Sequence, residues 1–219
     1  MWRRTDRKKL FVGIGLLCFS YFLMDTIVRE GVPITFIEIL FKYPKAIRQV
    51  GESFSFTSCF LDWFYFVLPI AIGIVMIPYW CDELRVGYYK MVKIRSGKKK
   101  YIADVVIINH LNAIICLIAS YAIFVISVLL IFRRNGVMLQ LNGEILVGVT
   151  YSLVYALWIS AILVFVASLS ANPYITVTLT FLINYIVYAK DLPIVLLLIM
   201  TVIIDVAAVY LMDRRWMQC

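Results

Sequence analysis

The sequence has few of the residues that build a metal centre. His110 is its one histidine, whereas intramembrane metalloenzymes need several histidine or carboxylate ligands at defined spacing. The five cysteines are Cys18, Cys59, Cys81, Cys116 and Cys219. They lack the short paired spacing of a zinc site or a redox motif, so we expect them to be unpaired. No metal ligand set is therefore predicted.

Motifs for nucleotide binding and for acid–base catalysis are also missing. The chain contains no GxxxxGK[ST] phosphate loop, whose backbone amides and lysine would hold the phosphates of a nucleotide. No acid–base pair or Ser–His arrangement stands out, because Asp25, Asp62 and Glu144 lie at the ends of apolar runs, where they stay solvated. The sequence therefore predicts that this chain binds no cofactor and does not hydrolyse ATP by itself.

Charge is scarce, since charged residues make up 16% of the chain against 63% hydrophobic residues, and the mean hydropathy is +0.94. A water-soluble domain of 219 residues could not bury so much apolar surface in one core. The net charge of +8 lies beside the apolar runs, where anionic lipid headgroups attract it. We therefore predict one all-α integral membrane domain over residues 1–219, with membrane lipids and no nucleic acid as partners.

Six apolar segments approach the roughly 20 residues that a helix needs to cross the hydrocarbon core. They are Leu10–Val28, Leu61–Cys81, Val105–Phe132, Ile145–Leu169, Tyr174–Ala189 and Leu192–Met212. Lys190 and Asp191 with Pro193 separate the last two, and a tight outer hairpin is the simplest interpretation; one re-entrant element is the alternative. The first segment is followed by no small-residue cleavage signature, so we expect it to be retained. The prediction is a bundle of six transmembrane helices.

The basic residues give this bundle an orientation. Fourteen of the 21 lysines and arginines fall in residues 1–9, in the loop after the second span and at the C-terminus. Positively charged loops stay on the cytoplasmic side, so both termini are expected there, in a multi-pass protein of the cell membrane. The outer loop, residues 29–60, has apolar residues at helical spacing. It is predicted either to cap the bundle as an amphipathic helix or to gate a substrate.

The inner loop between the second and third spans, residues 82–104, is amphipathic. Apolar side chains alternate in it with seven lysines and arginines, which suits an interfacial helix on anionic lipid or a docking helix for a cytosolic partner. Gly97 is expected to end this helix and to turn the chain toward the third span.

Small and polar residues mark two features within the spans. The fourth span carries a ridge of small residues at four-residue intervals, Gly148, Ser152, Ala156 and Ser160. Such a ridge lets another helix approach closely, either within the chain or at a dimer seam.

The second feature is a set of polar residues at positions inside the bundle. Asp205 lies near the middle of the sixth span, where a carboxylate must be paired, hydrated or protonated. Further polar candidates for the interior are Asn184, Asn109, Asn112 and His110. Asp205 is expected to act as a hydrogen-bond clamp or to lie on a substrate or proton path, whereas His110 is expected to make ordinary hydrogen bonds.

The inner loop also carries a family pattern. Glu83 is followed four positions later by Gly87, then by apolar residues, and the turn Ser96-Gly97-Lys98 leads into the third span. In this order, and in its six spans with cytoplasmic ends, the chain resembles the ABC-type-2 transporter permease family as a small, divergent member. The resemblance implies a homodimer or a heterodimer of two permease halves and a separate cytosolic ATPase subunit that binds ATP and Mg²⁺. The residues implied to couple to that ATPase are Glu83, Leu84, Gly87, Tyr88, Met91, Arg95, Ser96, Gly97 and Lys98.

The function that this resemblance implies is that of an exporter subunit which forms a translocation pathway. Sparse charge within the spans favours an amphipathic peptide, a lipid or a drug as cargo. An ATP-independent channel, scramblase or membrane scaffold is the alternative, followed by a polytopic enzyme that uses Asp205 or His110.

Overall fold

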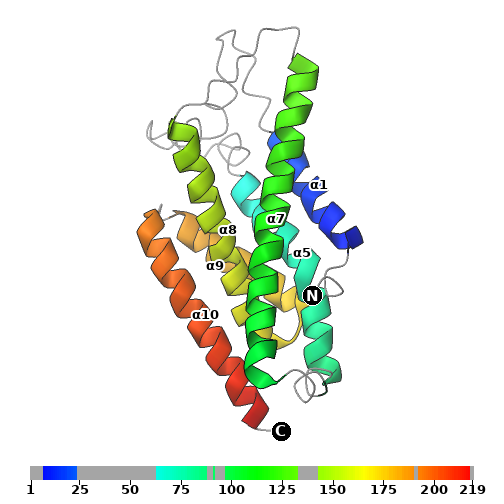
Figure 1. Ribbon diagram of the computed structural model, residues 1–219, viewed down its shortest axis with the longest axis vertical. Coiled ribbons are helices and arrows are strands. Elements are labelled where there is room, and N and C mark those ends of the chain that lie inside the picture. Colours follow the sequence, from blue (N-terminus) through cyan, green and yellow to red (C-terminus); the bar gives the residue numbers. More distant parts are fainter. Residues whose placement is uncertain are drawn as a thin grey trace.

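The structure is a computed structural model, and it describes residues 7–23, 63–87, 91, 97–132, 143–189 and 192–217. Its elements are α-helices throughout these ranges (Figure 1). Their bounds are α1 Arg7–Leu23, α5 Trp63–Val86, α7 Lys98–Phe132, α8 Gly143–Ser170, α9 Pro173–Ala189 and α10 Ile194–Met217. The predicted all-α class is confirmed, with six helices among the described residues.

Four of these helices are long and apolar enough to cross a membrane, namely α5, α7, α8 and α10. The apolar part of α9, Pro173–Val187, is shorter, and α1 has 17 residues where a straight crossing needs roughly 20. The chain is therefore a membrane protein with four candidate spans in its described part. The six-span bundle and the side on which the termini lie remain predictions.

The described helices extend into the predicted inner loop. Helix α5 continues to Val86 and α7 begins at Lys98 instead of Val105, so residues 87–97 of the predicted stretch 82–104 lie between the two helices. The predicted ends of these two helices lie beside the first charged residues. A helix can extend past the hydrocarbon core, because charged side chains there reach water or headgroups. The helix that Gly97 was expected to end lies outside the described residues, but the backbone of Gly97 suits a turn. Gly87 and Gly97 have φ of +70° and +82°, the left-handed region in which glycine commonly stops a helix.

Other predictions fall outside the described residues. These are the outer loop 29–60, most of the charged N-terminal segment, the Lys190–Asp191 step and the loop residues Tyr88, Arg95 and Ser96. In the described part, the last turns of α5 and α10 and the first turn of α7 lie at the same end of the bundle (Figure 1). This end is called the loop end below.

Helix α8 is the centre of the bundle, because it packs against α5, α7, α9 and α10. In its most apolar stretch 78% of the residues are buried, whereas in α10 the share is 17%. The largest fully buried side chains include Trp158, Tyr155, Ile159 and Ile162 of α8. A helix that is apolar all round and buried all round needs neighbours on every side, so α8 organises the others.

The outer faces of the surrounding helices are apolar. Examples are Ile107 and Ile118 on α7, Leu182 on α9, and Val202 and Ile203 on α10, each between 47% and 62% exposed. An apolar surface of this extent is what lipid covers in a membrane-spanning bundle. Among the described helices, α10 contributes the largest share of these exposed apolar side chains, because its contacts are chiefly with α8.

Helix α1 approaches α5 closely at a glycine. A Cβ atom added to the buried Gly13 would lie 2.8 Å from the carbonyl oxygen of Ala71 and 2.9 Å from Cγ2 of Val75. The nearest atom belongs to the backbone of α5, so it could move only if the helix moved. Gly15, two positions further on, has nothing within 4 Å of the same added atom.

This difference gives a matched pair of variants. Gly13→Ala is expected to destabilise the protein by about 1–3 kcal/mol through overpacking against α5. Gly15→Ala is expected to be neutral or to stabilise it by up to about 1 kcal/mol, since alanine favours a helix. Unfolding in mixed micelles, followed by circular dichroism, measures both. Equal effects of the two substitutions would contradict the close contact at Gly13.

Candidate functional site

The polar residues predicted to lie inside the bundle do so, but they form separate contacts. Asn109, Asn112 and Asn184 are buried, and Asp205 is partly buried with 22% of its side chain exposed. Asn112 Nδ2 donates to Met76 Sδ at 2.9 Å, which joins α7 to α5. Asn184 Oδ1 accepts a hydrogen bond from the Tyr155 hydroxyl, which joins α9 to α8. These contacts tie neighbouring helices together.

Asp205 belongs to a cluster that joins three helices. Its Oδ2 lies 2.9 Å from Nε2 of His110 on α7, and Nδ1 of the same imidazole meets Oγ of Ser160 on α8. Asn109, next to His110, donates from Nδ2 to the carbonyl oxygen of Ser160 at 2.8 Å. His110, Ser160 and Asp205 each lie close to the middle of their apolar stretches, which places the cluster at the middle depth of three candidate spans. We call these four residues the midplane cluster.

The expectation that no Ser–His arrangement exists is wrong. Ser160, His110 and Asp205 are connected in the order of a catalytic triad, and Ser160 had been assigned only to the small-residue ridge. A triad needs a reachable nucleophile and free N–H groups for the oxyanion. Ser160 is fully buried, its hydroxyl donates to the Leu157 carbonyl at 2.9 Å, and it lies within a continuous helix. In this arrangement the Ser160 hydroxyl is not placed as a nucleophile, and the contacts join α7, α8 and α10.

The small-residue ridge of α8 packs within the chain in its described part. Ser152, Ala156 and Ser160 are buried, and Ser152 Oγ accepts a hydrogen bond from the Tyr121 hydroxyl of α7 at 2.9 Å. Gly148 lies on the same helix, but its surroundings are outside the described residues. These three small residues let α7 approach α8 within the chain, and the seam with a second copy stays a prediction.

A second polar contact closes the inner loop at its base. The Tyr101 hydroxyl, near the start of α7, donates to Oε2 of Glu83, near the end of α5, at 2.8 Å. The rings of Trp80 and Tyr101 lie beside this bond with centroids 6.0 Å apart. Glu83 and Tyr101 are 5% and 1% exposed, so the bond is shielded from competing water. We call Glu83 and Tyr101 the loop clamp.

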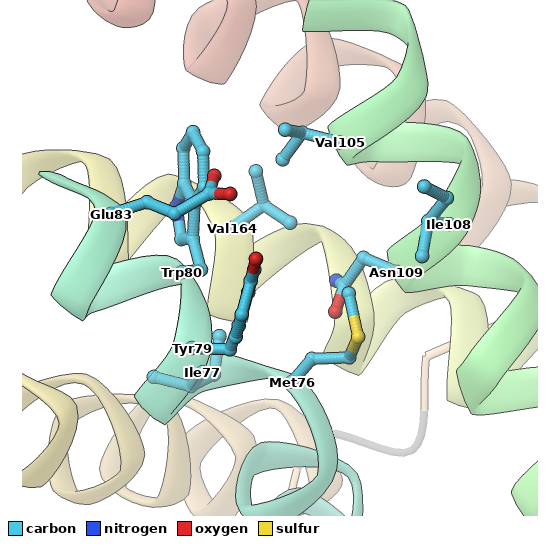
Figure 2. A pocket seen from close by; sticks show the side chains of 9 residues that line it. All are labelled: Met76, Ile77, Tyr79, Trp80, Glu83, Val105, Ile108, Asn109 and Val164. Carbon is cyan, nitrogen blue, oxygen red and sulfur yellow. The ribbon is translucent and has the colours of Figure 1, made fainter. Parts of the chain in front are cut away.

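A small pocket lies between the loop clamp and the midplane cluster, walled by α5, α7 and α8 (Figure 2). Its lining residues are Met76, Ile77, Tyr79, Trp80, Glu83, Val105, Ile108, Asn109 and Val164. Glu83 therefore belongs both to the pocket and to the loop clamp, and Asn109 belongs both to the pocket and to the midplane cluster. The two polar contacts are thus neighbours along α7, the helix that contributes to both.

The residues predicted to couple to an ATPase divide into two groups in the structure. Glu83 is buried and Leu84 is partly buried, and both lie within α5. Met91, between the two helices, is 66% exposed, and Gly87 and Gly97 adjoin α5 and α7 on either side of it. Lys98 is the first residue of α7.

Among the described residues, no three His, Cys, Asp or Glu side chains come together as metal ligands.

The coupling within the midplane cluster can be measured with a double-mutant cycle. Asp205→Leu and His110→Leu are each expected to destabilise the protein by about 1–3 kcal/mol, because each leaves its partner alone in a low-dielectric region. The double variant is expected to cost less than the sum, because neither group is then left behind. Unfolding in mixed micelles provides the free energies, and strictly additive values would contradict a direct contact.

Comparison with known proteins leaves the family open. No family model, no curated protein and no solved structure matches the chain. The resemblance to ABC-type-2 permeases therefore stays a prediction. The geometry of the loop clamp and of the midplane cluster carries the functional proposal that follows.

Proposed function

We propose that this chain is the membrane-spanning permease subunit of an ATP-driven ABC exporter, coupled through Gly87–Gly97 to a separate cytosolic ATPase that binds ATP and Mg²⁺. The observation that supports this most is the loop clamp. A connection that only joined two spans would not need a buried carboxylate and a buried hydroxyl at its base, since burying polar groups is costly. A connection that transmits force needs both of its ends held together.

The loop clamp gives such force a route into the bundle. Because Glu83 and Tyr101 are bonded, movement of the loop displaces the ends of α5 and α7 together. Gly87 and Gly97 provide the turns at which the loop meets each helix. Both helices pack against α8, and α8 carries α10, so a displacement at the loop end reaches the outermost helix through the central one.

Contact with the ATPase falls to the exposed side of the loop end. Val86 and Met91 are 81% and 66% exposed, and they lie next to a segment rich in lysine and arginine. Glu83 is too deeply buried to touch a partner in this arrangement, so it positions the loop instead of binding the ATPase. Apolar side chains surrounded by cations suit a partner surface with an apolar groove and an acidic rim.

The cargo that fits this bundle is amphipathic. Apart from the midplane cluster, the described spans contain almost no charge in their middle thirds, and their outer faces are apolar. A lipid, an amphipathic peptide or a drug could move along such a surface, whereas a highly charged solute would lose its hydration without compensation. A second permease half, in a homodimer or a heterodimer, would complete the pathway in the cell membrane.

The association with an ATPase is directly testable. The affinity-tagged chain is purified in mild detergent from its native membranes, and accompanying proteins that contain a GxxxxGK[ST] phosphate loop are identified by mass spectrometry. Met91→Ala is expected to reduce the recovered ATPase roughly fivefold or more if Met91 is an anchor of the interface. Ile118→Ala removes a comparably exposed apolar side chain from α7 away from the loop, and it should leave recovery unchanged.

The loop clamp makes a separate prediction for the same complex. Tyr101→Phe removes the hydroxyl that holds Glu83 but keeps the ring beside Trp80, so the ATPase should still be recovered. The rate of ATP hydrolysis by the complex should change severalfold, because the helices no longer move as one. The proposal would be wrong if no ATPase accompanies the chain, or if Met91→Ala and Ile118→Ala behave alike.

A further inference from the structure

The pocket between the loop clamp and the midplane cluster is lined by two side chains whose polar atoms are not satisfied. One atom is Nε1 of Trp80 on α5, and the other is Oδ1 of Asn109 on α7. Trp80 is 5% exposed and Asn109 is 1% exposed, yet neither atom has a hydrogen-bond partner among the described residues. A buried polar atom without a partner is costly, so a small molecule that bonds to these atoms stabilises the bundle.

The two atoms have opposite hydrogen-bonding roles. An indole N–H can only donate, so Trp80 needs an acceptor. The amide of Asn109 is oriented by its other end, because Nδ2 donates to the Ser160 carbonyl oxygen at 2.8 Å and a carbonyl oxygen can only accept. Oδ1 is therefore the end of the amide that still needs a donor. A molecule that both accepts and donates matches the pair, whereas a cation with donors alone or an anion with acceptors alone matches one atom only.

The size of the pocket restricts what can enter it. Its volume is about 20 Å³. A water molecule needs roughly 10–15 Å³ of such space, together with polar atoms to bond to. The pocket therefore has room for one or two water molecules, and water is both an acceptor and a donor. A lipid chain or a drug-sized molecule needs far more room.

The two polar side chains come from opposite walls of the pocket. Figure 2 shows Trp80 with Glu83 on one side and Asn109 with Ile108 on the other, and Val164 of α8 lies between them. Ile108 and Val164 are 6% and 1% exposed, and neither side chain offers a hydrogen bond. The polar side chains on the two walls therefore determine where water is held.

We propose that this pocket binds one or two water molecules, which accept a hydrogen bond from Trp80 Nε1, donate one to Asn109 Oδ1 and so join α5 to α7. These two helices make fewer direct contacts with each other than each makes with α8. The bound water supplies a link between them, between the loop clamp and the midplane cluster. Because Asn109 also bonds to the Ser160 carbonyl, the link continues to α8. This water site does not depend on an ATPase partner.

The indole N–H of Trp80 reports on this water by nuclear magnetic resonance. The full-length protein with ¹⁵N-labelled tryptophan, in mixed micelles, has five indole groups, and the Trp80 signal is the one lost in Trp80→Phe. Cross-relaxation between an indole hydrogen and water is measured in the rotating frame, where its sign separates a nearby water from hydrogen exchange. The Trp80 N–H is expected to show a nearby water.

Two variants of α8 test where this water is held. Val164→Ile adds a methylene group at the wall of the pocket, so it is expected to displace the water and to abolish the cross-relaxation of Trp80. Val154→Ile makes the same addition at another buried valine of α8 that does not line the pocket, and it should leave the signal unchanged.

Three results would overturn the proposal. The first is a native Trp80 N–H with no nearby water, and the second is a native Trp80 N–H that shows contact with detergent chains instead. The third is an equal Trp80 signal in Val164→Ile and Val154→Ile. Should Val164→Ile fail to fold, the measurement on the native protein decides.

Discussion

The enclosure of α8 is the constraint on which the rest of the structure depends. A helix in lipid satisfies its own backbone, but its side chains pack only against what surrounds them. Helix α8 meets a different helix on each side, and it approaches α7 closely because Ser152, Ala156 and Ser160 are small. Polar side chains then fix the neighbours: Tyr121 and His110 from α7 bond to α8, and Tyr155 of α8 bonds to Asn184 of α9. The positions of α7, α9 and α10 all follow from α8.

The loop clamp and the midplane cluster both include residues of α7, so this helix connects the two polar contacts. Tyr101 holds the loop end of α7 to α5, and His110, nine residues later, holds its middle to α8 and α10. Nine residues of helix span roughly 13 Å, a distance over which an α-helix behaves as a rigid rod. A displacement at the loop end and a rearrangement of the midplane cluster therefore act on the same element. Helix α10, which has the fewest buried residues among the four candidate spans, is the helix freest to respond.

Much of this fold follows from the sequence, because length and apolarity are local properties. The described helices coincide with predicted segments, and the turn at Gly97 lies where a glycine follows an amphipathic stretch. The helix ends were less predictable, since charged residues such as Arg85 and Lys100 remain helical beyond the apolar core. Asp205 and the three asparagines were recognised as interior residues because polar groups are costly in lipid. Their partners could not be named, because His110 lies 50 residues from Ser160 and 95 from Asp205, and only helix packing brings them together.

Coupling to a cytosolic ATPase requires the segment Gly87–Gly97 to face the cytoplasm, where the ATPase can reach it. The most direct measurement uses Met91→Cys in a variant whose five native cysteines are replaced, together with a maleimide that does not cross membranes. Labelling in inside-out vesicles and not in intact cells is the predicted result. Labelling of Met91→Cys in intact cells would place the loop outside and would contradict the proposed coupling to a cytosolic partner.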